Sequence, residues 1–233
     1  MNKNIKDHDR LIFALDVPTV AKAKNLVEEL GDSVSFYKIG LELFMSGEYF
    51  ELLEWLKAKQ KKIFVDLKFF DVPATVGRAI KQLNGKGVTF ATIHGNDSIM
   101  KCAAENKGDV QILAVTVLTS LDRGDLDDLG FDCDVEQLVI SRAKRAVSLG
   151  CDGVVASGLE APKMREKLGN NFMIVSPGIR PVDNDDDQKR VVTVEKAFEN
   201  GADYIVIGRP IRDAENPKLA AQQIQAQISQ VFN

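Results

Sequence analysis

The chain has 233 residues, of which 45% are hydrophobic and 27% charged, and its formal net charge is −4. This length and apolar content suffice for one sizeable core. The acidic balance argues against a nucleic-acid-binding surface and against binding to anionic membranes. The first ten residues are polar and unlike a signal peptide, and no run approaches the ~18 apolar residues of a membrane span. We therefore expect a cytoplasmic protein.

The metal-binding residue types are sparse. Cys102, Cys133 and Cys151 are an odd number without the spacing of a zinc site, and His8 and His94 are the only histidines. The acidic run at 183–187 is typical of a solvated lid rather than a metal site. We expect three free thiols and no metal.

Strand-type and helical segments alternate along the chain. The strand-type segments are short and rich in apolar and β-branched residues, whereas the helical segments repeat apolar residues every three to four positions. Gly31 and Gly150 mark two helix ends. The expected strands are 11–17, 35–40, 63–68, 89–95, 111–119, 153–157, 172–176 and 204–208. The expected helices are about 18–30, 48–59, 74–83, 98–104, 135–149, 160–168, 194–199 and 216–231, and 120–134 is a polar loop with room for a short helical turn.

This alternation predicts parallel strands joined by right-handed crossovers. Eight units of roughly 25–30 residues fit a closed (β/α)8 TIM barrel of α/β class better than an open doubly wound sheet, which is the alternative. We expect one barrel domain over residues 1–233, with no internal linker.

Four charged residues lie at the expected carboxyl ends of the first three strands. Side chains alternate along a strand, so Asp66 and Lys68 share the face opposite Ile63 and Val65. The same alternation turns Asp16 and Lys38 inward in a barrel. Barrel enzymes place their sites at this end of the strands. We therefore predict one charged site, which Asp71 on the following loop could join.

Two glycine- and arginine-containing loops follow the last two strands. Pro177–Pro181 contains Arg180, and Ile207–Pro210 contains Gly208 and Arg209. Glycine allows close backbone approach, and the guanidinium fork matches phosphate oxygens. Loops in these positions of a barrel often bind phosphate, so we expect a phosphate site here.

Together these motifs resemble the orotidine 5′-phosphate decarboxylase family over nearly the whole chain. The D-x-K-x-x-D set at Asp66, Lys68 and Asp71 leads the resemblance. At two loop positions the chain departs from the family, with Phe70 and Ala74 where members often have His and Asn. The other matching motifs are F-A-L-D at 13–16, Y-K-I-G at 37–40, T-V-L-T-S at 116–120, P-G-I-R-P at 177–181 and I-G-R-P at 207–210.

The resemblance implies a metal- and cofactor-free homodimer that converts orotidine monophosphate to uridine monophosphate and CO2 in pyrimidine synthesis. It implies active sites at the subunit interface. Lys38, Asp66 and Lys68 would form an alternating charged array with Asp71 of the partner subunit. Lys68 would deliver the proton to the carbon that loses CO2.

The resemblance also implies the contacts to the nucleotide. Asp16 and Lys38 would hold the ribose together with Thr75 of the partner subunit. Residues 180–190 would form a lid. The pyrimidine would meet Thr119 and Ser120, and the phosphate would meet Gln188, Gly208 and Arg209, with Arg180 nearby.

Two other functions stay open. A hexulose- or ketogulonate-phosphate lyase of the same barrel group shares D-x-K-x-x-D, but those magnesium enzymes carry an acidic residue where Lys38 stands. A non-catalytic phosphosugar-binding barrel would not require two lysines and two aspartates at one mouth. His94 either faces that mouth or is a hydrogen-bonded barrel histidine.

Overall fold

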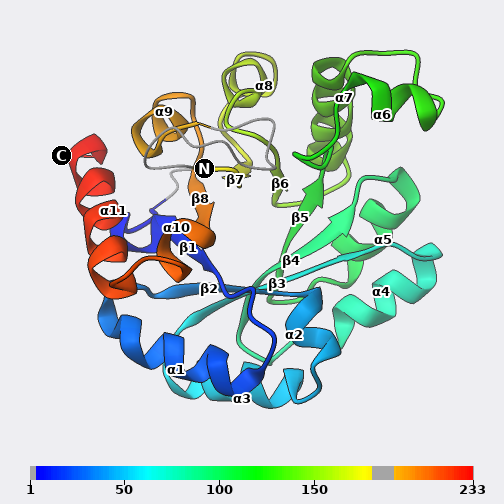
Figure 1. Ribbon diagram of the computed structural model, residues 1–233. Coiled ribbons are helices and arrows are strands. Elements are labelled where there is room, and N and C mark those ends of the chain that lie inside the picture. Colours follow the sequence, from blue (N-terminus) through cyan, green and yellow to red (C-terminus); the bar gives the residue numbers. More distant parts are fainter. Residues whose placement is uncertain (1–3, 180–191, 233) are drawn as a thin grey trace.

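The computed structural model describes residues 4–179 and 192–232, and its centre is a closed barrel of eight parallel strands ringed by helices (Figure 1). Each strand pairs with its neighbours in sequence, and β8 closes onto β1. The predicted (β/α)8 barrel is confirmed. The strands are β1 (Leu11–Ala14), β2 (Phe36–Gly40), β3 (Lys62–Phe69), β4 (Val88–His94), β5 (Gln111–Val115), β6 (Gly153–Val155), β7 (Met173–Ser176) and β8 (Tyr204–Ile207).

The helices begin at polar caps where the sequence provides them. Thr19 accepts a hydrogen bond from the backbone N–H of Lys22 at 3.2 Å, and Asp134 caps α7 in the same way. No helix among the described residues is long and apolar enough to cross a membrane. The helices are α1 (Val20–Leu30), α2 (Leu41–Met45), α3 (Tyr49–Ala58), α4 (Pro73–Lys81), α5 (Asp97–Asn106), α6 (Arg123–Asp128), α7 (Val135–Ser148), α8 (Ala161–Leu168), α9 (Val194–Glu199), α10 (Arg209–Arg212) and α11 (Pro217–Phe232), with 3₁₀ turns η1 (Asp7–Arg10) and η2 (Gly31–Ser33).

Alternation along the strands separates two apolar cores. Outward side chains such as Phe13 and Val65 join the large core between the strands and the helices. Inward side chains form a smaller core within the barrel. Its aromatic rings pack closely, with centroids 5.2 Å apart for Phe36 and Phe90 and 5.2 Å for Phe90 and Tyr204. This aromatic layer fills the barrel below its carboxyl-terminal mouth.

Some sequence-based strand ends were wrong, among them that of the first strand, which was predicted to reach residue 17 but ends at Ala14. The fifth strand was predicted to reach residue 119, but β5 ends at Val115. The next residue, Thr116, turns its hydroxyl to the carbonyl of Val155 at 3.0 Å, and the chain then leaves the sheet. The short helices α2 and α10 were not predicted because four or five residues carry too little periodicity to be recognised. The polar loop, for which a short helical turn was allowed, does contain one: α6 starts at a capping box formed by Asp122 and Asp125.

Candidate active site

A cluster of four charged side chains lies at the mouth of the barrel, two from β3 (Asp66 and Lys68), one from β2 (Lys38) and one just after β1 (Asp16). The ammonium of Lys38 lies 3.0 Å from Asp16 Oδ1 and 3.4 Å from Asp66 Oδ2. The ammonium of Lys68 lies 3.0 Å from the same Asp66 oxygen. The predicted convergence of these four side chains is confirmed.

The strand register explains why they meet. Ala14 pairs with Lys38, and Gly40 pairs with Asp66, so adjacent strands end at similar heights. Asp16, Lys38 and Asp66 each follow an inward apolar residue by two positions, which places these charges directly above the aromatic layer. Gly40 lies beside the cluster, where a Cβ would be in ordinary van der Waals contact with Lys38 Nζ, at 3.5 Å.

The two buried members of the cluster hold one another in the charged state. The side chains of Lys38 and Asp66 are only 12% and 11% exposed. Burial favours neutral Asp66, but the ammonium groups of Lys38 and Lys68 outweigh it and hold the pKa of Asp66 below its ordinary value. Burial likewise favours neutral Lys38, yet Asp66 and Asp16 raise its pKa above the ordinary value. The ammonium group of Lys38 is therefore available as a fixed positive charge at neutral pH.

A cavity of about 160 Å³ opens directly onto this cluster. Its polar wall contains Lys38, Asp66 and Lys68, together with Thr119 from the loop after β5. The rest of the wall is apolar, and a flat ring with few polar edges suits such a space. The apolar lining consists of Phe64, Val115, Val117, Leu118, Val155, Pro177 and Val206.

A second pocket of about 260 Å³ adjoins the first, because Lys38 lines both. It is bounded by Asp16 and by Gly208 and Arg209, which belong to the loop for which a phosphate site is predicted. A Cβ on Gly208 would lie 3.3 Å from the Cβ of Ala14, so the chain passes close to β1 at this point. The pocket offers a guanidinium and a glycine backbone to an anion.

Sequence analysis missed Arg212, which also lines the second pocket. Its guanidinium donates to the backbone carbonyl of Asp16 at 2.8 Å. The spacing Arg209–Arg212 places both residues on one turn of α10, and that helix was not predicted. The pocket therefore has two arginines rather than one among its described residues.

Three predicted site residues lie elsewhere on the chain's own surface. Asp71 is exposed, and its Oδ1 accepts a hydrogen bond from the Val72 N–H at 2.6 Å. No ion pair within the described ranges joins Asp71 to a lysine. Thr75 is half-buried and accepts from Arg78 at 3.2 Å, and Ser120 is exposed. Arg180 and Gln188 fall outside the described residues.

The cysteines are free thiols, as predicted. Cys151 is buried, and burial raises the pKa of its thiol to about 12. In the described parts of the chain, no group of three or more His, Cys, Asp or Glu side chains could hold a metal ion.

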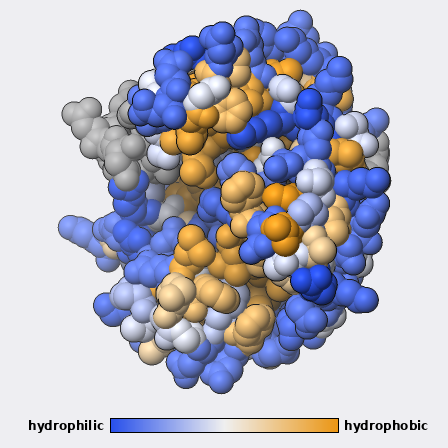
Figure 2. All heavy atoms as spheres, turned by 90° about the vertical axis from the view of Figure 1, so that its right-hand side faces the viewer, coloured by the Kyte–Doolittle hydropathy of each residue, from blue (hydrophilic) through white to orange (hydrophobic). Residues whose placement is uncertain are grey.

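A larger hollow of about 750 Å³, the apolar groove, lies beside the mouth. Val117 and Leu118 line both the groove and the 160 Å³ cavity. Figure 2 shows apolar side chains gathered in a hollowed band across this face, flanked by hydrophilic atoms. The groove is also lined by Leu121, Leu126, Leu129, Phe131 and Leu138, with Arg142 and Arg145 at its polar side.

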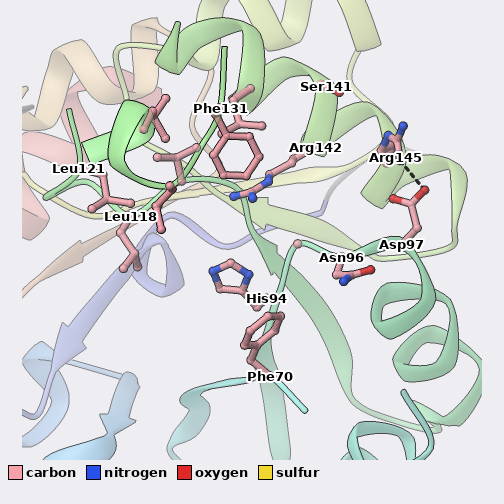
Figure 3. A pocket seen from close by; sticks show the side chains of 15 residues that line it. Phe70, His94, Asn96, Asp97, Leu118, Leu121, Phe131, Ser141, Arg142 and Arg145 are labelled. Carbon is pink, nitrogen blue, oxygen red and sulfur yellow. Dashed lines mark hydrogen bonds and ion pairs between the residues drawn. The ribbon is translucent and has the colours of Figure 1, made fainter. Parts of the chain in front are cut away.

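His94 lies in this groove rather than in the charged cavity. Its ring packs against Phe70, with centroids 4.7 Å apart, and the guanidinium of Arg142 points toward it from the other side (Figure 3). Burial and the positive charge of Arg142 lower the pKa of His94 below its ordinary value. The ring makes no hydrogen bond within the described residues, so the interpretation as a hydrogen-bonded barrel histidine was wrong, and His94 lines the groove beside the mouth instead.

A parallel barrel with a charged, partly apolar cavity at its mouth and an arginine pocket beside it defines a TIM-barrel enzyme for a small anionic substrate. The sequence model of the Orotidine 5′-phosphate decarboxylase / HUMPS family matches residues 9–224. The chain belongs to this family.

Named relatives agree with that assignment. The chain is 69% identical to the orotidine 5′-phosphate decarboxylase of Methylococcus capsulatus over 233 residues, which covers 99% of this chain and 96% of that protein. It is 53% identical to the Stenotrophomonas maltophilia enzyme of the same name, covering 97% and 95% of the two chains. The crystal structure of orotidine 5′-phosphate decarboxylase from Lactobacillus acidophilus is similar with a TM-score of 0.84 at 34% identity, covering 94% of this chain and 99% of that one.

Proposed function

We propose that this chain decarboxylates orotidine 5′-monophosphate to uridine 5′-monophosphate and CO2, in the cytoplasm, without a metal or cofactor. One observation carries the proposal. Two ammonium groups, of Lys38 and Lys68, lie within 3.4 Å of a single carboxylate oxygen of Asp66, in a cavity whose remaining walls are mostly apolar. The relatives that bear this name support the choice of substrate.

The chemistry requires stabilisation of a carbanion. Loss of CO2 from the pyrimidine leaves an electron pair on carbon, and a fixed cation beside that carbon lowers the barrier. Lys68 is such a cation, and it carries the proton that completes the reaction as a general acid. Two charges 4 Å apart interact by about 4 kcal/mol at an effective dielectric constant of 20. Several contacts of this size approach the ~8–23 kcal/mol that enzymes supply.

Asp66 holds the two lysines in place. Its Oδ2 accepts from Lys68 at 3.0 Å and lies 3.4 Å from Lys38, so the ammonium of Lys68 has one preferred position at the cavity wall. The same carboxylate would repel a substrate carboxylate that is bound nearby, and departure of CO2 relieves that repulsion. We assign Asp66 chiefly to orientation of the lysines.

The two pockets suit the two ends of a nucleotide. The pyrimidine occupies the 160 Å³ cavity, where Thr119 faces its edge, whereas Ser120 lies outside the lining of that cavity. The ribose lies beside Asp16 and Lys38, and the phosphate binds to Gly208 and Arg209 in the adjoining pocket. Gln188, Arg180 and the lid predicted for 180–190 belong to the same proposal, outside the described residues.

The enzyme is a homodimer in this proposal, with Asp71 and Thr75 acting in the partner's site. The exposed position of Asp71, away from its own chain's lysines, supports this arrangement. Apolar side chains surround it: Phe70 is 64% and Val72 63% exposed. Such residues, together with the apolar groove, form the kind of surface that monomeric proteins rarely expose. A second copy would cover this face and bring Asp71 to the array.

Mixing two inactive variants tests the dimer. Lys68→Ala and Asp71→Ala each inactivate their own homodimer. If Asp71 acts across the interface, a mixed dimer holds one site with both residues intact, and random exchange restores roughly a quarter of wild-type activity. An Asp71 that acts within its own chain gives no recovery, and a gel-filtration profile of a monomer refutes the dimer directly.

The absorbance of orotidine monophosphate in excess EDTA tests the activity. Loss of the orotate chromophore with formation of uridine monophosphate is the expected result. Activity that appears only on a hexulose or ketogulonate phosphate, after magnesium is restored, would assign the chain to the lyase branch instead. A folded dimer inactive in both assays would point to a binding protein and refute the proposal.

A further inference from the structure

The strand pairing between β3 and β4 is interrupted at the charged cluster. Val65 pairs with Ala91, and the next pair is Phe69 with Ile93. Residues 66–68 therefore lie opposite a single β4 residue, Thr92. Lys68 adopts a left-handed backbone conformation, with φ of 47°. An interruption of this kind leaves backbone N–H and C=O groups without their usual partners on the neighbouring strand, and it redirects the side chains.

The hydroxyl of Thr92 fills the interruption. Thr92 is fully buried, and its Oγ1 accepts a hydrogen bond from the backbone N–H of Lys68 at 3.0 Å. The same oxygen lies 2.9 Å from Asp66 Oδ1. An ionised carboxylate can only accept, so the hydroxyl proton points to Asp66. The direction of both hydrogen bonds is thereby fixed.

These contacts close a ring around the reactive lysine. The ring runs from the Lys68 backbone to the Thr92 hydroxyl, on to Asp66 Oδ1, and from Asp66 Oδ2 back to the ammonium of Lys68 at 3.0 Å. With Oδ1 held by Thr92, the carboxylate cannot rotate, and Oδ2 stays between the two ammonium groups. Thr92 itself is not among the residues that line the described cavities.

We propose that Thr92 is a positioning residue, which fixes the Asp66 carboxylate and the backbone of Lys68 so that the ammonium points into the cavity. The role rests on the proposed decarboxylase function of the same site. Thr92 acts through Asp66 and Lys68 and does not touch the ligand. Loss of the Thr92 hydroxyl should therefore lower kcat and leave the affinity for the nucleotide unchanged.

Two variants separate positioning from packing. Thr92→Val keeps the shape and removes the hydroxyl, and we expect kcat to fall on the order of 10²-fold, because small misplacements of a reacting group cost about this much. Its dissociation constant for uridine monophosphate stays at the wild-type value. Thr92→Ser keeps the hydroxyl and restores most of the turnover.

A titration provides a readout that needs no turnover. The hydrogen bond from Thr92 favours charged Asp66, so its removal raises the pKa of that carboxyl group. We expect the carbon-13 resonance of the Asp66 carboxyl group to titrate at higher pH in Thr92→Val than in the wild type, with Thr92→Ser close to the wild type. If the wild type proves inactive on orotidine monophosphate, the proposed function fails, but this titration still tests the hold of Thr92 on Asp66.

Thr116 provides the matched control. It is a buried threonine beside β5, and its hydroxyl donates to the carbonyl of Val155 rather than to a carboxylate. We expect Thr116→Val to lose stability while its kcat and Asp66 titration stay unchanged. The proposal is overturned if Thr92→Val keeps wild-type kcat and titration, if the Ser and Val variants lose turnover alike, or if Thr116→Val loses as much kcat.

Discussion

Replacement of Lys38 by methionine tests whether the charged cluster stabilises the fold as well as the chemistry. Lys38→Met keeps the length and apolar stem of the side chain and removes its charge. At 3.4 Å, the attraction between Lys38 and Asp66 is about 5 kcal/mol at an effective dielectric constant of 20. Part of this is offset, because burial of an ammonium group costs several kcal/mol.

The ion pair of Lys38 with Asp16 adds little to the stability of the fold. Asp16 is 45% exposed, and an ion pair with such a partner contributes roughly 0–1 kcal/mol. In the variant, Asp66 still has its ion pair with Lys68, so the substitution leaves no unpaired buried carboxylate. We expect a net loss of about 3 kcal/mol, at the lower end of the cost of breaking a buried ion pair. For a chain of this size, the melting temperature then falls by roughly 6–12 °C.

Urea unfolding at pH 7, at fixed protein concentration because a dimer's stability depends on it, measures the loss. The pH dependence gives a second check. The pKa of Asp66 is held below its ordinary value of 3.8, so the stability from this group is present above that value and is lost as the pH falls through the folded-state pKa. With Lys38 gone, the folded-state pKa is less depressed, so the loss of stability in acid is smaller and is complete at a higher pH.

Lys196→Met is the control. It removes an ion pair of similar length, 3.2 Å to Glu199, in which both side chains are about 60% exposed (59% and 60%), so we expect almost no change in stability. Equal melting temperatures for Lys38→Met and the wild type would refute the reasoning, because they would mean that the ion pair at Asp66 contributes nothing beyond its desolvation.

Three further results are expected. Lys68→Ala loses turnover but still binds uridine monophosphate, as isothermal titration calorimetry should show; near-normal turnover would remove Lys68 from the proton-transfer step. Arg209→Ala lowers kcat/KM on the order of 10²-fold at an unchanged melting temperature, because the phosphate contact supplies remote binding energy, and an unchanged kcat/KM would contradict the assigned phosphate pocket. The pKa of His94 is lowered below its ordinary value of 6.5, so wild-type stability falls as the pH drops from 6.5 toward the folded-state pKa. His94→Gln flattens that part of the urea-unfolding pH profile, and an unaltered slope would show that His94 titrates normally.

The barrel was predictable because its signals are local and repeated. Each strand is a short apolar segment between polar turns. Side chains alternate along a strand, so the order Phe64, Val65, Asp66 predicts that Phe64 and Asp66 face inward and Val65 outward. The same rule placed Asp16, Lys38, Asp66 and Lys68 at one mouth. Their assigned roles remain predictions for the assays to test.

The parts that sequence reasoning missed depend on contacts between distant segments. Thr92 lies 24 residues beyond Lys68 along the chain, and its position in an alternating apolar strand suggests nothing more than a tolerated hydroxyl. Only the interrupted pairing of β3 with β4 gives it a role. Arg212 was missed for a similar reason, since its contact with the carbonyl of Asp16 joins the two ends of the barrel, 196 residues apart.

The aromatic layer beneath the charged cluster determines how substrate enters the barrel and how products leave it. Phe36, Phe64 and Phe90 are at most 1% exposed, and Tyr204 completes the packing beside them, so the barrel is a chamber with a closed floor. Whatever enters at the mouth must leave by the same opening. In a decarboxylase, CO2 and the nucleotide product would share that opening. The residues of the floor thus close one end of the barrel and leave the mouth as the route by which both products depart.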